Sequence, residues 1–171
     1  MQEIDALGPA WRNHVIQDFA RSKLFERTFQ EGMDLVEETA AYLDGSGRQE
    51  SKLLSRNAAL AYAGESMRPT TRLMQVASWL LVQRAVREGD MAPTAACEER
   101  YRLSEESPTA EVEAARAELP LSLIGLADRA ERLYEQVRRL DRRMYVDGKD
   151  AEGAPNPVLS HFDRLKTAFG G

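Results

Sequence analysis

Residues 70–86 hold the densest apolar pattern in the chain, and its spacing is typical of a helix with two apolar sides. At 100° per residue, one broad side is formed by Leu73, Met74, Val76, Ala77, Leu80 and Leu81. The nearly opposite side is formed by Trp79, Val82 and Val86. A helix that is apolar on two sides must be covered on two sides, by two helices of its own chain or by one helix and a second subunit. The pattern therefore predicts a buried central helix. It leaves the Trp79 side either buried inside one bundle or forming a homodimer seam.

A second amphipathic helix is predicted before the central one, from Ser22 to the glycines at residues 45–47. Its apolar residues recur three and four positions apart and are Phe25, Phe29, Met33, Val36, Ala40 and Leu43. Ser22 is a suitable N-cap, and Gly45-Ser46-Gly47 favours a turn over continued helix. Because a short loop joins antiparallel neighbours, the central helix is expected to run back alongside this one.

The central helix is expected to begin near Ser51, a second candidate cap. The inner face of its first part is formed by Leu53, Leu54, Ala58, Ala61 and Tyr62. Pro69 then removes one backbone donor and clashes with the carbonyl four residues earlier, which kinks a helix that continues through it. The sequence predicts one long, kinked central helix.

The third helix has the most regular pattern in the chain. Its apolar residues alternate three and four apart, as in a heptad seam, and are Leu123, Leu126, Ala130, Leu133, Val137, Leu140 and Met144. Ser122 is the expected N-cap. Four basic residues complement the negative end of the helix dipole and are interpreted as a solvated helix end: Arg138, Arg139, Arg142 and Arg143. The three patterns together predict an all-α fold, an antiparallel three-helix bundle over residues 22–144.

Three segments outside these helices have weaker patterns. Residues 1–21 are expected to form an N-terminal arm, frayed or ordered by a partner. Residues 88–118 carry nine acidic residues and three arginines, and this acidic segment is expected to be a mobile loop. Within it, a short helix is expected to start at residues 107–109 and to run to Leu119.

Residues 145–171 are expected to be a flexible linker followed by a C-terminal docking peptide, disordered when alone. The apolar side of this peptide is formed by Val158, Leu159, Phe162, Leu165 and Phe169. The groove that receives it lies either on its own bundle or on a partner protein.

The charge of the chain disfavours nucleic acid as a partner. The net charge is −5, whereas affinity for nucleic acid comes chiefly from basic residues that release counterions. No apolar run is long enough to span a bilayer, and the N-terminus lacks the pattern of a signal peptide. Cys97 is the single cysteine and forms no internal disulfide, in keeping with a reducing compartment. We therefore expect a cytoplasmic protein with no membrane contact.

The sequence shows no catalytic apparatus. His14 and His161 are far apart and belong to no metal-ligand spacing. Glycine-rich phosphate loops, dinucleotide fingerprints and the hydrolase motifs are missing. Glu65 lies at helical spacing from Arg68 and Arg72, which indicates ion pairing better than acid–base catalysis. The sequence predicts no enzyme, no cofactor and no metal.

A family resemblance suggests a function. Residues 61–66 read Ala-Tyr-Ala-Gly-Glu-Ser, residues 70–75 Thr-Thr-Arg-Leu-Met-Gln, residues 77–81 Ala-Ser-Trp-Leu-Leu and residues 83–86 Gln-Arg-Ala-Val. With residues 33–42, the chain length and the heptad helix before a loose tail, these runs resemble the RcdA family of alphaproteobacteria, named as regulators of CtrA degradation. The resemblance covers most of the chain.

The resemblance implies a three-helix bundle that forms a homodimer and has no activity of its own. Such a protein serves as an adaptor for the ClpXP protease in cell-cycle proteolysis. The implied partners are the ClpXP complex, the response regulator CpdR, the cyclic-di-GMP effector PopA and substrates such as CtrA. The implied location is the cytoplasm, concentrated at a cell pole.

Two other classes of function compete with the adaptor. A helical DNA-binding or other transcriptional regulatory protein is suggested by the small all-α fold and the basic residues 138–143. The acidic net charge and the lack of a helix-turn-helix pattern argue against it. A cofactor-binding bundle is disfavoured because the Glu and His-bearing motif of di-iron proteins is absent. A gel shift with DNA at low and physiological salt separates the DNA-binding alternative from the adaptor.

Overall fold

The computed structural model describes residues 7–103 and 116–145, with side chains from residue 12 onward. The long helices are α2 (Lys23–Asp44), α4 (Arg56–Glu88) and α7 (Leu121–Tyr145). The shorter elements are α1 (Leu7–Ala20), α3 (Ser46–Lys52), α5 (Pro93–Ala96) and the 3-10 turns η1 (Glu99–Tyr101) and η2 (Arg116–Glu118). Neither described range contains a strand, and the prediction of an all-α fold is confirmed.

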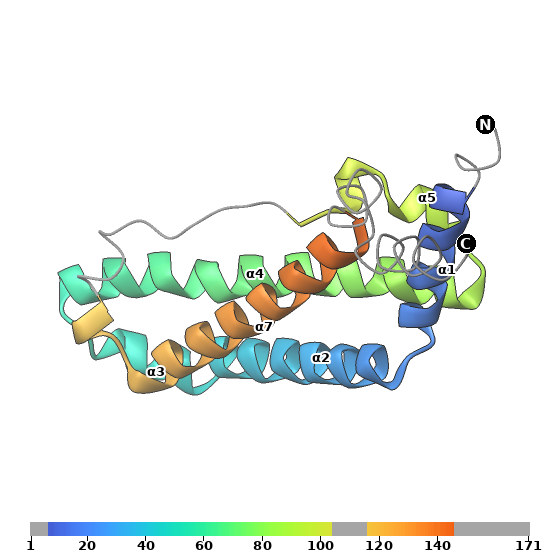
Figure 1. Ribbon diagram of the computed structural model, residues 1–171. Coiled ribbons are helices and arrows are strands. Elements are labelled where there is room, and N and C mark those ends of the chain that lie inside the picture. The colour runs from blue at the N-terminus through green and yellow to red at the C-terminus, as the bar shows by residue number, and fades with distance from the viewer. Residues whose placement is uncertain (1–6, 104–115, 146–171) are drawn as a thin grey trace, which may run out of the picture.

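The three long helices form a bundle (Figure 1). α2 and α4 lie side by side in opposite directions, as the short connection predicted. α7 crosses them and runs in the same general direction as α4, because Arg72 contacts Glu131 and, farther along both helices, Gln83 contacts Tyr145. The expectation of antiparallel neighbours is therefore wrong for this pair. η2, just before α7, lies beside the first half of α4, since Arg116 Nε is 4.0 Å from Glu65 Oε2, so α7 starts near the same end of the bundle as α4.

The connection after α2 differs from the predicted turn. Ser22 does cap α2, since its Oγ accepts a 3.1 Å hydrogen bond from the N–H of Phe25, and Gly45 ends the helix. Ser46 and Gly47, however, belong to α3. Gly47 is buried, and a Cβ there would come within 2.7 Å of two tyrosine side chains. This glycine therefore permits close packing and not a turn.

α4 begins four residues later than expected. Its N-cap is Ser55 and not Ser51, and the Ser55 Oγ accepts a 3.2 Å hydrogen bond from the N–H of Ala58. Leu53, predicted on the inner face, ends α3 and is 88% exposed. The helix continues through Pro69 as one element of 33 residues, which confirms a single long central helix. The kink itself stays a prediction.

α2 turns a different line of residues to the core than its apolar spacing indicated. The buried line is Phe25, Thr28, Gly32, Leu35, Thr39 and Tyr42. Of the predicted residues, Phe25 is buried as expected and Ala40 is exposed. The remaining four lie half-buried at the rim: Phe29, Met33, Val36 and Leu43. A Cβ on Gly32 would lie 3.0 Å from Cδ1 of Leu80. Small residues on the buried line therefore let α2 approach α4 closely.

α7 matches its predicted seam. Leu140 is half-buried, and the other six seam residues are buried: Leu123, Leu126, Ala130, Leu133, Val137 and Met144. Ser122 lies inside the helix and is exposed, so its assignment as N-cap is wrong. Tyr145, placed in the linker by the sequence, ends the helix with a buried side chain.

α1 belongs to the folded core. It packs against α4, α5 and α7 near the C-terminal end of α4 (Figure 1). Ile16 and Ala20 are fully buried, and the ring centre of Phe19 lies 5.7 Å from that of Trp79. The prediction of an N-terminal arm is therefore wrong for residues 7–20, because this helix covers the Trp79 side of α4.

The acidic segment is also folded where it is described. α4 ends at Gly89, whose φ of 82° is left-handed, and α5 and η1 follow. Ala96 is buried, as is Leu119 just before α7. The prediction of a mobile loop is wrong for residues 89–103, and residues 116–118 form a 3-10 turn and not the end of an α-helix. The helix start predicted at residues 107–109 lies outside the described residues.

Candidate partner-binding surface

The outer face of α4 carries a line of exposed apolar side chains. They lie seven residues apart and are 68, 69, 66 and 52% exposed, in the order Leu60, Met67, Met74 and Leu81. A strict seven-residue repeat keeps side chains on one line of a helix and is the spacing of a coiled-coil seam. These four residues are called the α4 ridge.

Between positions 57 and 83, α4 itself presents no exposed charge around the ridge. The charged residues between positions 57 and 83 are Glu65, Arg68 and Arg72, of which Arg68 is half-buried and the others are buried. The remaining exposed positions are small or uncharged: Asn57, Ala63, Gly64, Thr70, Thr71 and Ser78. At 1.5 Å per residue this uncharged face is about 40 Å long. Because charged residues make up 30% of the chain, so long an uncharged face is typical of a protein contact surface.

The charges of this stretch are paired toward α7. Arg72 Nε lies 3.2 Å from Glu131 Oε2, and its guanidinium lies 3.9 Å over the ring of Tyr134. Arg68 lies 3.7 Å from the same carboxylate and 3.9 Å from Glu65. The predicted pairing of Glu65 with Arg68 is confirmed, whereas Arg72 pairs across the helix interface. These inward contacts leave the outer face of α4 uncharged.

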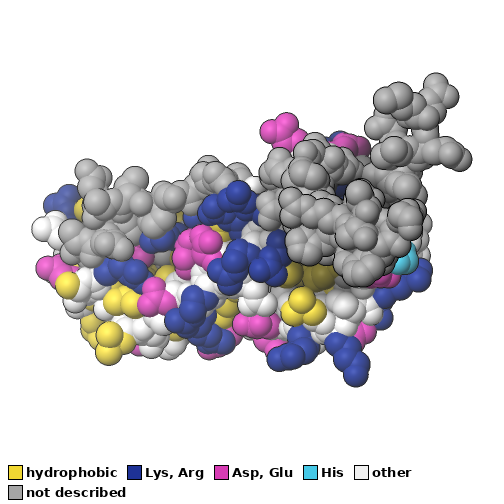
Figure 2. All heavy atoms as spheres, viewed as in Figure 1, with side chains coloured by type: hydrophobic (Ala, Val, Ile, Leu, Met, Phe, Trp, Pro, Cys, Tyr) yellow, Lys and Arg dark blue, Asp and Glu magenta, His cyan; other side chains and the backbone are white. Residues whose placement is uncertain are grey.

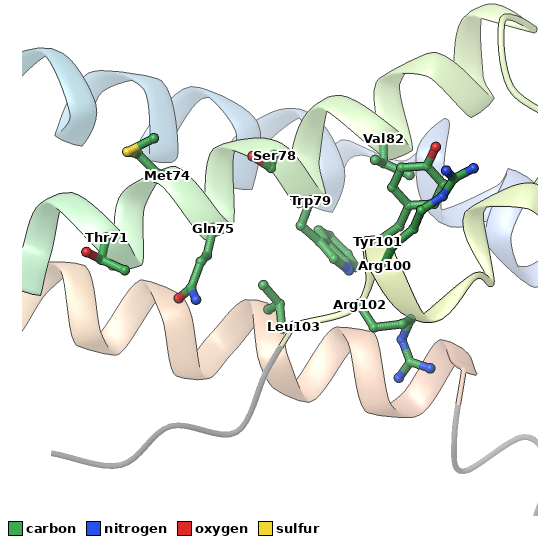
Figure 3. A pocket seen from close by; sticks show the side chains of 10 residues that line it. All are labelled: Thr71, Met74, Gln75, Ser78, Trp79, Val82, Arg100, Tyr101, Arg102 and Leu103. Atoms are coloured by element: carbon green, nitrogen blue, oxygen red, sulfur yellow. The ribbon is translucent and has the colours of Figure 1, made fainter.

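Two hollows flank Met74. The first has a volume of about 380 Å³ and lies between α4 and residues 100–103, with side chains from both walls facing it (Figure 3). The second, of about 320 Å³, lies between α2 and α4 and is lined mainly by apolar residues, among them Val36, Leu43 and Ala77. A ridge between two hollows can interlock with a second ridge of the same kind.

Asp141 of α7 holds the far wall of the first hollow in place. Its buried carboxylate accepts two 2.8 Å hydrogen bonds from Arg102 and one of 2.9 Å from Trp79 Nε1. The guanidinium of Arg102 also lies 4.7 Å from the ring centre of Tyr145. Burial alone would lower the pKa of Arg102, but the bonds to Asp141 raise it above its ordinary value. Arg102 therefore stays charged and fastens residues 99–103 beside the α4 ridge.

Comparison with known proteins shows which family the chain belongs to. A family model described as "Protein of unknown function (DUF1465)" matches residues 16–169. The crystal structure of RcdA from Caulobacter crescentus CB15 is similar with 68% sequence identity and a TM-score of 0.63, covering 76% of this chain and 98% of that chain. The chain belongs to the RcdA family. The resemblance to RcdA drawn from the sequence is thereby confirmed. A comparison with curated proteins found no match.

The dimer seam predicted for this RcdA-family chain lies inside its own bundle. Trp79 and Val86 are buried in the single chain, and Val82 is half-buried beside the first hollow. Of the two arrangements left open for this side of α4, the structure shows burial within one chain. α1 and α7 cover Trp79, so of the three predicted seam residues only Val82 keeps part of its surface.

The α4 ridge was missed by the sequence reasoning, which assigned Met74 and Leu81 to a buried side. Two signals could have found it. One is the seven-residue spacing from Leu60 onward, and the other is that every charge in the stretch falls on the side facing α7. Apolar periodicity alone records that a residue is apolar, and not whether a neighbour covers it.

The remaining predicted sites fall outside what the structure describes. The C-terminal docking peptide, Val158, Leu159, Phe162, Leu165 and Phe169, lies beyond residue 145 and stays a prediction. Across residues 7–103 and 116–145, no three His, Cys, Asp or Glu side chains gather as a metal site requires. No helix in the described part of the chain is long and apolar enough to cross a membrane.

Proposed function

We propose that this RcdA-family protein is a non-enzymatic adaptor that links substrates and regulatory partners to the ClpXP protease in cell-cycle-regulated proteolysis. The observation that carries the proposal is the 68% identity to RcdA over 98% of that chain. The α4 ridge supports it, because an adaptor acts through protein contacts and this face is uncharged over about 40 Å. The proposed partners are the ClpXP complex, CpdR, PopA and substrates such as CtrA, with action at a cell pole.

A reconstituted degradation reaction tests this function. Purified ClpXP, CpdR, PopA and CtrA are mixed with ATP and cyclic-di-GMP, with and without the chain, and the loss of CtrA is followed on gels. The chain is expected to raise the rate of CtrA loss several-fold, while an unrelated ClpXP substrate in the same tube is degraded at an unchanged rate. Equal rates of CtrA loss with and without saturating chain would refute the adaptor role.

We further propose that the C-terminal peptide captures partners. Deleting residues 156–171 is expected to leave thermal stability nearly unchanged while weakening substrate delivery in the same reaction. Replacing only its apolar side by serine should have the same effect, at Val158, Phe162 and Phe169. The matched control replaces polar residues of the same peptide, Asp163, Lys166 and Thr167. A truncated chain that melts much earlier, or that delivers every substrate as well as the intact chain, would contradict the proposal.

We also propose that the homodimer forms through the α4 ridge. The centre of the ridge lies between Thr70 and Thr71, whose small side chains allow close approach. A two-fold axis at that point brings Leu60 of one copy to Leu81 of the other and Met67 to Met74, so one ridge fills the hollows beside the other.

The energy of this contact is of the size a dimer needs. Full burial of such a side chain stabilises by about 1.5 to 3 kcal/mol, and these side chains are roughly two-thirds exposed, so each contributes about 1 to 2 kcal/mol. With four side chains in each of two copies, the sum is comparable to the roughly 4 to 15 kcal/mol that association costs. Contacts between the flanking small residues decide the affinity.

Sedimentation measures the proposed dimer directly. Met67→Glu with Met74→Glu places charge in the seam and is expected to give the mass of a monomer at concentrations where the intact chain is a dimer. The matched control adds the same charge at two exposed apolar positions off the ridge, Leu53→Glu and Leu121→Glu, and should stay dimeric. Trp79→Ala is expected to lower stability without changing the mass. A ridge variant that sediments like the control would refute this face.

A further inference from the structure

α7 shows only arginine at its exposed positions from residue 129 to its end. These positions are Arg129, Arg132, Arg139, Arg142 and Arg143. The acidic residues of the helix are half-buried or buried, and each is used in an ion pair with an arginine: Asp128, Glu131, Glu135 and Asp141. Figure 2 shows basic side chains gathered on the face that α7 crosses. The acidic side chains of the helix are each paired with an arginine, whereas its fully exposed positions carry positive charge, in a chain whose net charge is −5.

Three of these arginines have no partner within the described residues. Arg129 bonds to Glu38 at 2.7 Å, and Arg142 also has an interaction, which leaves Arg132, Arg139 and Arg143. The three are seven and four residues apart, so they lie on one side of α7 and span about 16 Å along its axis. These three residues are called the arginine row.

The solvated helix end inferred from the sequence does not account for the arginine row. The helix dipole acts within the last turn, and Arg132 lies more than three turns before Tyr145. Arg139 and Arg143 stand four residues apart, where like charges destabilise a helix. Glu135 stands four residues before Arg139 and offsets part of this repulsion, but its 3.5 Å ion pair is with Arg138 and not with the row. The row therefore presents three positive charges with no ion pair among the described residues, and an anion that covers it is favoured.

We propose that the arginine row is a docking site for an acidic segment of a partner protein. The guanidinium fork binds carboxylates through paired hydrogen bonds. A span of about 16 Å corresponds to about five residues of extended chain, so a short segment with a few Asp or Glu covers the row. Exposed ion pairs are individually weak and screened by salt, which gives a transient contact. A nucleic acid fits less well, because the acidic chain repels a phosphate backbone.

Fluorescence anisotropy tests the site with a defined probe, a labelled peptide of twelve residues that alternates Glu and Ser. The intact chain is expected to bind it at about 50 mM salt and to lose affinity at least tenfold when Arg132, Arg139 and Arg143 are all changed to Gln. The matched control changes Arg27, Arg48 and Arg56 to Gln. These arginines are also exposed, and either variant moves the net charge from −5 to −8. The control should bind within about twofold of the intact chain.

Three results would overturn the proposal. One is no binding of the peptide by the intact chain. Another is equal loss in both triple variants, which would mean that only net charge matters. The third is tighter binding of a labelled twelve-nucleotide single-stranded DNA that depends on the same three arginines. Arg132→Gln alone, in the middle of the helix, gives the same comparison of peptide affinity with the intact chain after the loss of one charge. Circular dichroism checks that each variant is folded. The assay contains no protease component, so it can fail independently of the adaptor function.

Discussion

Asp141 connects three parts of the chain, and its replacement tests how the fold is held together. Asp141 is 2% exposed, and its carboxylate bonds to Trp79 in the second half of α4 and to Arg102 in the segment after α5. Asp141→Ala removes three hydrogen bonds at once. It leaves the Trp79 N–H and the Arg102 guanidinium without this acceptor.

The expected loss follows from burial. Removing one partner of a buried ion pair costs about 3 to 5 kcal/mol, because the other charge is left unpaired. The side chain of Arg102 is 20% exposed, so water recovers part of this cost and we expect about 3 kcal/mol. Asp141→Asn keeps one oxygen that accepts from Trp79, but it loses the charge, and its NH2 replaces the oxygen that accepts from Arg102 Nη2. It should therefore cost about 2 kcal/mol, less than Asp141→Ala.

Urea denaturation of the single variants and of the double variant with Arg102→Ala measures how much the pair of Asp141 and Arg102 contributes to the free energy of unfolding. The double-mutant cycle should give a coupling energy of about 1.5 to 3 kcal/mol between the two residues. Limited proteolysis should cut residues 99–103 faster in Asp141→Ala, because their main anchor to α7 is lost. The matched control is Glu135→Ala, whose carboxylate is 44% exposed and 3.5 Å from Arg138, and it should cost less than about 1 kcal/mol. If Asp141→Ala costs no more than this control, or the coupling is zero, the reasoning is refuted.

Two further predictions concern the core and the alkaline limit of stability. Leu80→Ala and Leu133→Ala should each cost about 2 to 5 kcal/mol, because both side chains are at most 2% exposed; unchanged denaturation midpoints would contradict their burial. Burial raises the pKa of Tyr145 to about 12 from its ordinary 10, with the hydrogen bond from Gln83 acting in the opposite direction. The folded chain therefore keeps a proton that the unfolded chain releases, so this contribution is complete below pH 10 and is lost as the pH rises toward 12. Tyr145→Phe should flatten the fall in urea midpoint above pH 10, and parallel curves for the two proteins would count against this assignment.

The sequence by itself determined those features of the fold that depend only on residues close together in the chain. The seam of α7 is apolar at every third or fourth position, so its buried side follows from spacing alone. The cap at Ser22 depends on one side chain and the N–H of Phe25. The pairing of Glu65 with Arg68 needs only helical geometry. Each of these features is settled within a few residues, and the structure agrees with all three.

Only the tertiary structure decided which apolar residues are covered. The buried line of α2 contains Thr28, Gly32 and Thr39, which no count of apolar residues selects, because their value lies in the close approach of α4. On α4, Trp79 is covered by α1 and α7, whereas Met74, equally apolar, lies between the two hollows and stays 66% exposed. The apolar pattern of a helix indicates which of its side chains can be buried. The burial itself requires a neighbour that arrives from far along the chain, as α1 does over Trp79.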